Sequence, residues 1–245
     1  MSLTKSDIKL VRSLKNKEGR AEHGLFVCEG RKLTGELLKS PFKVRRIFSV
    51  GGDANAPGVD VETVTKSEME RLSLLKTPTD ILALVEIPEW QESPAGGLSI
   101  VLDGVQDPGN LGTIIRIADW FGIGTVYCSL DSADCFNPKV VQATMGSITR
   151  VKVLYRDPAE LLAGTGLPVY GTFLDGDDIY DTGLASEGFI VMGSEGRGIS
   201  DDAGAYVTRR LFIPPFPPGN RTGESLNVAA AAALVCAEFR RRAKT

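Results

Sequence analysis

Polar side chains follow three of the most apolar runs in the chain, where those runs give way to glycine, proline and small polar residues. Five of these side chains have groups that bind ligands or assist proton transfer: Asn110, Arg116, Glu195, Ser225 and Asn227. A guanidinium binds phosphate or carboxylate through paired hydrogen bonds, whereas amide, hydroxyl and carboxylate groups orient a ligand. The set therefore predicts a site in which an arginine meets a polar or anionic ligand.

Each of these residues also has a purely structural interpretation. Asn110 and Ser225 are residue types that cap helix N-termini, and Glu195 suits an exposed surface. On a helical wheel Arg116 lies opposite the apolar face, which fits a solvated side chain equally well. Asn227 is different, because it is the single polar residue in the apolar stretch 226–237 and needs hydrogen-bond partners if that stretch is buried. These alternatives stay open on the sequence alone.

Cysteine and histidine usage argues against a metal centre. The cysteines form no CxxC pair, and one histidine, His23, is too few to complete a site with them. We expect reduced thiols packed as small apolar side chains at Cys28, Cys128, Cys135 and Cys236. The glycine-rich stretch GSEGRG at 193–198 lets backbone approach a ligand closely, but neither GxGxxG nor GxxxxGK[ST] occurs, which disfavours NAD and nucleoside-triphosphate sites.

The apolar runs themselves read as buried strands, at 99–105, 189–193 and 209–214. The first is followed by a predicted helix over about 111–121 and a strand at 125–129, which is the strand–helix–strand pattern of a parallel sheet. Ligands in such sheets sit beyond the carboxyl ends of the strands. The three loops should therefore converge, and a last helix over 225–242 follows the third.

The first third of the chain has shorter alternating elements. We predict a basic amphipathic helix at 6–20, a helix at about 31–38, and strands that include 25–28, 43–50 and 81–87. Prolines, glycines and polar residues in PEWQESPAGG mark a linker. The predicted organisation is α/β throughout, with a small N-terminal domain (1–88), a linker (89–97) and a C-terminal domain with a parallel sheet (98–245).

Charge is distributed unevenly. The whole chain has a net charge of −3, yet residues 1–46 carry +7 and residues 240–245 carry +4. A basic end on an acidic body predicts contact with a polyanion, although a solvated charged surface is the alternative. The side chains we expect to contact the polyanion are Lys9, Arg12, Lys15, Lys17, Arg20 and Arg31.

No apolar run approaches the length of a membrane span, and the first residues lack the apolar stretch of a signal peptide. We therefore expect a cytoplasmic protein without a membrane partner.

The three loops together resemble the three motifs of the SpoU (TrmH-type) branch of the SPOUT methyltransferases. NLGTIIRIADWFG resembles the first motif, GSEGRGIS the second, and IPP followed by ESLNVAAAAAL the third, in the same order. FVCEGRKLTGELL and KTPTDILALVEIP resemble the ribosomal-protein-like substrate-binding domain often fused in front, which implies a small RNA-binding domain.

The resemblance implies a function and roles for residues. The function is methyl transfer from S-adenosylmethionine to a ribose 2′-hydroxyl of structured RNA, with rRNA favoured over tRNA. Arg116 matches the family's catalytic arginine, and the supporting polar residues are Asn110, Glu195, Ser225 and Asn227. The positions that hold the cofactor are Gly193, Ile213 and Leu226.

The resemblance also implies a deep trefoil knot over roughly 189–242 and a homodimer formed largely by the last helix. One departure stands out, since Pro215 replaces the family's usual methionine and PFPPGNRTGE is longer than the usual spacer. A non-catalytic RNA-binding or ribosome-assembly protein with the same fold is the main alternative function. A knotted methyltransferase acting on a base nitrogen is a second, which the pairing of Asn110 with Arg116 disfavours.

Overall fold

A computed structural model describes residues 3–52, 54–92, 96–217 and 225–243. The chain divides into two compact units, one made of residues 1–89 with 134–149 and the other of residues 90–133 with 150–245. Residues 93–95 of the predicted linker and 218–224 of the third loop lie outside the described residues.

The first unit is built on a mixed four-stranded sheet in the order β1-β4-β2-β3. Its elements up to residue 89 are α1 (Lys5–Ser13), α2 (Lys17–His23), β1 (Leu25–Glu29), α3 (Arg31–Leu38), β2 (Val44–Val50), β3 (Asp60–Val64), α4 (Lys66–Leu72) and β4 (Ile81–Glu86). The predicted strands at 25–28, 43–50 and 81–87 and the helix at 31–38 are confirmed, whereas β3 and α4 were not predicted.

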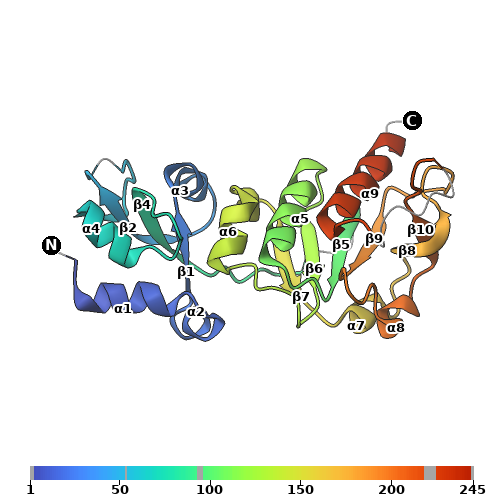
Figure 1. The fold of residues 1–245 in the computed structure, drawn as a ribbon, viewed down its shortest axis with the longest axis horizontal. Helices are drawn as coiled ribbons and strands as arrows, with labels where there is room; N and C mark the ends of the chain where they lie inside the picture. The colour runs from blue at the N-terminus through green and yellow to red at the C-terminus, as the bar shows by residue number, and fades with distance from the viewer. Residues whose placement is uncertain (1–2, 53, 93–95, 218–224, 244–245) are drawn as a thin grey trace. The chain divides into compact units, whose positions relative to one another are not determined.

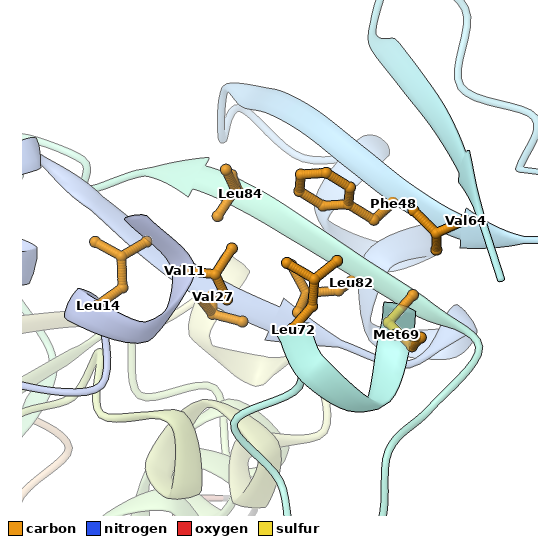
Figure 2. Packing of buried hydrophobic residues seen from close by; sticks show 9 residues of the cluster. All are labelled: Val11, Leu14, Val27, Phe48, Val64, Met69, Leu72, Leu82 and Leu84. Atoms are coloured by element: carbon orange, nitrogen blue, oxygen red, sulfur yellow. The ribbon is translucent and has the colours of Figure 1, made fainter. Parts of the chain in front are cut away.

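Helices α1 and α4 pack on one face of this sheet through a single apolar cluster. Figure 2 shows Val11 of α1 and Leu72 of α4 pointing toward the strand residues Val27, Phe48 and Leu82. All five side chains are almost completely removed from water. Burial on this scale is the main force that holds the helices to the sheet.

The predicted single helix at 6–20 is wrong, because the structure has two helices separated by residues 14–16. Asn16 begins α2 in an extended conformation, and Gly19 lets α2 approach the end of α1, where an added Cβ would lie 2.2 Å from the Ser13 carbonyl oxygen. The break turns Arg20 inward, so its side chain is 3% exposed.

Segment 134–149 lies between two strands of the second unit in sequence but packs with the first unit. It contains α6 (Pro138–Thr144) and the short 3-10 helix η1 (Ser147–Thr149). The Arg20 guanidinium donates to the Asp134 carboxylate, with Nε 3.1 Å from Oδ2, and the rings of Phe26 and Phe136 lie 4.8 Å apart. A buried ion pair and an aromatic contact therefore anchor the segment.

The second unit is a six-stranded parallel sheet in the order β10-β8-β9-β5-β6-β7, which confirms the predicted fold class. Its elements are β5 (Leu98–Asp103), α5 (Pro108–Trp120), β6 (Thr125–Cys128), β7 (Lys152–Tyr155), α7 (Pro158–Leu162), β8 (Val169–Asp178), β9 (Gly188–Gly193), α8 (Asp201–Gly204), β10 (Arg209–Phe212) and α9 (Val228–Arg242). Figure 1 shows α5 and α9 side by side. No helix within the described ranges is long and apolar enough to cross a bilayer.

The sheet register brings the ends of the three motif strands to one edge. Val101, Val191, Gly171 and Arg210 lie in one row across β5, β9, β8 and β10. Two residues further along, β5, β9 and β10 all end, so the loops after Asp103, Gly193 and Phe212 leave the sheet at its carboxyl edge. The predicted convergence of the three loops is confirmed.

Candidate active site

Helix α5 begins earlier than predicted, and Asn110 is not its cap. Asp107 is the N-cap, its carboxylate accepting a hydrogen bond from the Asn110 backbone N–H at 2.8 Å, and Pro108 occupies the first turn. Proline suits that position because its missing N–H would have no partner in the helix. With Asp107 as the cap, the Asn110 side chain is available for other contacts.

The Asn110 amide joins two loops at the carboxyl edge. Its Nδ2 donates to the carboxylate of Glu195, and its Oδ1 accepts from Nδ2 of Asn227 at 3.0 Å. Three of the five predicted catalytic residues therefore form one hydrogen-bonded chain across the three loops. Glu195 and Asn227 are exposed and Asn110 is half-buried, so the chain faces solvent at both of its ends.

Asn227 is also the N-cap of α9, which corrects the prediction of Ser225. Its Oδ1 accepts from the backbone N–H groups of Ala229 and Ala230, at 3.0 and 3.2 Å. This capping oxygen fixes the amide so that its N–H group points to Asn110. Ser225 is exposed, and none of the described residues bonds to its hydroxyl.

The glycines of the second loop close a tight turn. Ser194 and Gly198 pair, with the Gly198 N–H donating to the Ser194 carbonyl at 2.8 Å. A Cβ on Gly193 would lie 2.0 Å from the Gly198 carbonyl carbon, so no other residue fits there without moving the turn. Gly193 thus permits the backbone geometry that presents Glu195.

Arg116 lies apart from this network. It is exposed on α5, on the same helical face as Thr113 and Trp120, and makes no hydrogen bond or ion pair with any described residue. The predicted catalytic arginine is thus free to bind an anion supplied from outside.

Several contacts that brace the loops were not predicted. Asp103 accepts from the Ser200 backbone N–H at 2.7 Å, and the Ser129 hydroxyl accepts from the Gly104 N–H at 2.8 Å. Arg197 pairs with Asp131 at 2.8 Å. The hydrogen bond from Ser129 and the Arg197 guanidinium lower the pKa of the Asp131 carboxyl. An aspartate directly at the end of β5 was the signal available in the sequence.

The residues predicted to hold the cofactor surround the same edge. Gly193 ends β9, Ile213 directly follows β10, and Leu226 is 51% exposed beside Asn227. An exposed apolar side chain beside amide and carboxylate groups suits a ligand that combines an adenine ring with a charged sulfonium and amino acid. A hollow of about 320 Å³ lies at the opposite, amino edge of the sheet and includes Gly97, Gly124 and Gly188.

The predicted RNA-binding residues of the first unit fall into three groups. Lys9, Lys15 and Lys17 are exposed. Arg12 donates to the Arg71 carbonyl oxygen, and Arg31 pairs with Asp80 at 2.6 Å, although both stay exposed. Arg20 is buried and donates to Asp134 and to the carbonyl oxygens of Leu14 and Lys15, so the structure gives it an internal role instead.

The four cysteines are buried and lie outside any disulfide, as predicted. Burial raises the pKa of the Cys28 and Cys236 thiols to about 12, which keeps both protonated and unreactive near neutral pH. Among the described residues, no cluster of histidine, cysteine and carboxylate side chains could hold a metal ion.

Comparison with known families decides the identity of this site. A family model described as the SpoU rRNA Methylase family matches residues 97–237, the part that carries all three loops. The chain belongs to the SpoU rRNA methylase family. A second model, the MRM3-like substrate binding domain, matches residues 5–83 of the first unit.

Relatives of this SpoU methylase are similar along almost the whole chain. It is 32% identical over 238 residues to the 23S rRNA (guanosine(2553)-2'-O)-methyltransferase RlmP of Bacillus subtilis strain 168, covering 94% of each chain. It is 29% identical over 235 residues to the 23S rRNA (uridine(2479)-2'-O)-methyltransferase of Streptomyces viridochromogenes, covering 89% of this chain and 77% of the relative.

Solved structures agree with the same family. A TrmH-family protein of Porphyromonas gingivalis, described as an RNA methyltransferase, aligns with a TM-score of 0.90 and 40% identity, covering 99% of this chain and all of that one. An AdoMet-bound rRNA methyltransferase from Sinorhizobium meliloti aligns with a TM-score of 0.86 and 27% identity, covering 99% of this chain and 97% of the other. The likeness spans both units.

Proposed function

We propose that this protein transfers a methyl group from S-adenosylmethionine to a ribose 2′-hydroxyl of ribosomal RNA. The observation that carries the proposal is the hydrogen-bonded chain of Glu195, Asn110 and Asn227 at the carboxyl edge of a SpoU-family sheet. The relatives named above act on 23S rRNA, which favours rRNA over tRNA as the substrate.

S-adenosylmethionine supplies an activated methyl group, so the protein's own task is to orient the ribose oxygen and assist loss of its proton. Gly193, Ile213 and Leu226 would hold the cofactor. Their positions at the ends of β9 and β10 and before α9 would place it beside the amide chain. Ser225 would contribute a hydroxyl to the same site.

Arg116 would position the nucleotide rather than act as a base. A guanidinium has five N–H donors and no acceptor, and it is not deprotonated in folded proteins, so it is unsuited to take a proton from the ribose hydroxyl. Its exposed fork, which has no partner among the described residues, instead suits a bidentate contact with the phosphate next to the target ribose. The Glu195 carboxylate and the two amides would orient the ribose hydroxyl groups.

The first unit would hold the RNA outside the active site. Lys9 of α1, Lys15 in the link between α1 and α2, and Lys17 at the start of α2 are exposed and can neutralise phosphates. The match to a substrate-binding domain over residues 5–83 supports this role.

A homodimer, a trefoil knot and a cytoplasmic location complete the proposal. Helix α9 buries Val235 and Cys236 but leaves an apolar stripe at Ala230, Leu234 and Ala237 in contact with water. A second copy would cover this stripe, because soluble proteins rarely leave contiguous apolar surface open. Sedimentation equilibrium at micromolar concentration should find a dimer, and a stable monomer would contradict it.

A transfer assay tests the activity directly. The intact protein is incubated with labelled S-adenosylmethionine and either unmodified 23S rRNA or unmodified tRNA transcripts, and 2′-O-methyl positions are then mapped. We expect label in 23S rRNA at a single nucleotide and little label in tRNA.

Other outcomes identify the alternatives. Tight RNA binding without measurable S-adenosylmethionine binding would indicate a non-catalytic RNA-binding or ribosome-assembly protein. Label on a base nitrogen instead of a 2′-oxygen would overturn the assigned chemistry while keeping the family.

A further inference from the structure

Phe216 is the most exposed large apolar side chain among the described residues, at 90%. It belongs to the proline-rich stretch that departs from the family's usual third motif. None of the hydrogen-bonding groups in the proposed mechanism explains why an aromatic side chain should stand in water there. A lone exposed apolar residue is common on protein surfaces, so exposure by itself does not indicate a role. The position of Phe216 has to show whether it can contact a ligand.

The position of Phe216 is the active-site edge. Phe212 ends β10 two residues beyond Arg210, which lies in one row with Gly171 of β8 and Val191 of β9. Phe216 follows Phe212 by four residues, which limits its distance from that edge to roughly 14 Å. It therefore lies within reach of a nucleotide bound at the amide chain.

The backbone around Phe216 is stiff. Pro214, Pro215 and Pro217 have fixed φ angles, and a residue that precedes proline is restricted to extended conformations. Such a backbone presents the ring at little conformational cost on binding. A flexible glycine-rich loop would lose more entropy for the same contact.

The ring has no internal stacking partner in the described structure. Phe173, on the neighbouring strand β8, differs, because the Arg210 guanidinium covers its ring at 3.5 Å from the centroid. Phe216 makes no ring or cation contact with any described residue, so its faces are available to a ligand.

We propose that Phe216 stacks on a nucleobase of the RNA beside the ribose that is methylated. This inference rests on the proposed function. A nucleotide whose ribose enters a loop-lined site leaves its own base stack, and an exposed aromatic ring replaces part of the stacking that is lost. A contact between copies of the chain would call for a broader apolar patch than one ring between prolines.

Three substitutions in the full chain separate stacking from simple apolar contact. F216L keeps an apolar side chain and removes the ring, F216W keeps and enlarges the ring, and Y206A is a matched control. Tyr206 is an exposed aromatic residue before β10, at the opposite end of that strand from Phe216.

The readouts are KM and kcat for methylation of unmodified 23S rRNA and the Kd for S-adenosylmethionine. We expect F216L to raise the KM for RNA about tenfold, with kcat and cofactor Kd within about twofold. F216W should have the KM of the unaltered protein. Its new tryptophan adds fluorescence to that of Trp90 and Trp120, and RNA binding should quench this added fluorescence. Y206A should match the unaltered protein.

Several results would overturn the inference. An unchanged KM in F216L would exclude stacking, a raised cofactor Kd would place the ring on the cofactor, and loss of the dimer would place it between subunits. If the unaltered protein transfers no methyl group, the proposed function fails, and this inference fails with it. If the unaltered protein transfers the methyl group and F216L has the same KM for RNA, the inference fails while the proposed function stands.

Discussion

Arg20 in the first unit and Arg116 in the second both lie in stretches of sequence predicted to be helical, but their environments in the structure are opposite. Both sit among helical residues and were predicted to contact RNA or its reacting nucleotide. Arg20 is 3% exposed and donates to a carboxylate and two carbonyl oxygens, whereas Arg116 is exposed and unpartnered among the described residues. The difference shows that partners within the fold, rather than residue type, decide whether an arginine is free for a ligand.

The largest effect expected from this contrast is that of Arg116→Ala. Removing the group that positions the nucleotide should lower the rate of methyl transfer by about a hundredfold or more. The Kd for S-adenosylmethionine should stay within about twofold, because Arg116 is not among the residues assigned to the cofactor. Single-turnover transfer and calorimetric cofactor binding measure the two quantities.

Arg209→Ala is the control for that experiment. Arg209 is likewise an exposed arginine of the second unit, but it begins β10 at the amino edge of the sheet. Near-normal transfer by the Arg116 variant would mean that Arg116 is merely a solvated side chain.

Arg20→Met should act on stability instead of chemistry. It leaves the Asp134 carboxylate and the Leu14 and Lys15 carbonyl oxygens without their donor, and removing one partner of a buried ion pair costs about 3 kcal/mol or more. Urea unfolding of the full chain measures the loss. Without urea, where the variant is folded, its RNA affinity should depend on salt concentration as it does in the unaltered protein.

Lys15→Met is the matched change on the same segment. Lys15 is exposed, so its substitution should alter the free energy of unfolding by less than about 0.5 kcal/mol. Equal stability losses in the two variants would contradict the division between internal and ligand-facing charges.

Local pattern was enough to predict the strands and the parallel sheet, but not the ends of its helices. Apolar runs identified β5 and β9, because both strands are buried on both faces. Strand β10 lies at the edge of the sheet and buries only Leu211, so its apolar residues gave a weaker signal. Asn110 and Asp107 are both good capping residues three positions apart, and the choice between them depends on Pro108 and on Glu195, which lies far along the chain. Carboxylate and amide groups can either cap a helix or bind a ligand, so residue type alone does not tell the two roles apart.

The inward turn of Arg20 could not be predicted for a similar reason. The apolar spacing of the predicted helix ends at Leu14, and Asn16, a residue type that caps helix N-termini, was a local signal of the break. Neither signal indicates where the Arg20 side chain turns. The partner that makes Arg20 internal is Asp134, which lies 114 residues away. The free state of Arg116 was equally hidden, since a helical wheel shows exposure but not the absence of an ion-pair partner.

The smallest effect concerns the exposed lysines of the first unit. Because Arg20 is internal, these lysines are the residues near it that we expect to bind RNA. Lys9, Lys15 and Lys17 stay in water, and each phosphate they neutralise releases counterions. We expect K9Q/K15Q/K17Q to weaken RNA binding severalfold and to make the slope of log affinity against log salt shallower by about 2.

The full chain is the right molecule for this salt titration, because a chain shortened to the second unit would strip segment 134–149 of the partners it packs against. The matched control is K66Q/K76Q/K139Q, which removes the same charge from exposed positions outside α1 and α2. If net charge alone governed RNA affinity, both triple variants would shift the slope equally. A shift confined to the first variant would locate the RNA on α1 and α2, since only lysines that meet phosphates release counterions. Equal slopes in all three proteins would show that these lysines are simply solvated and that the second unit alone selects the RNA.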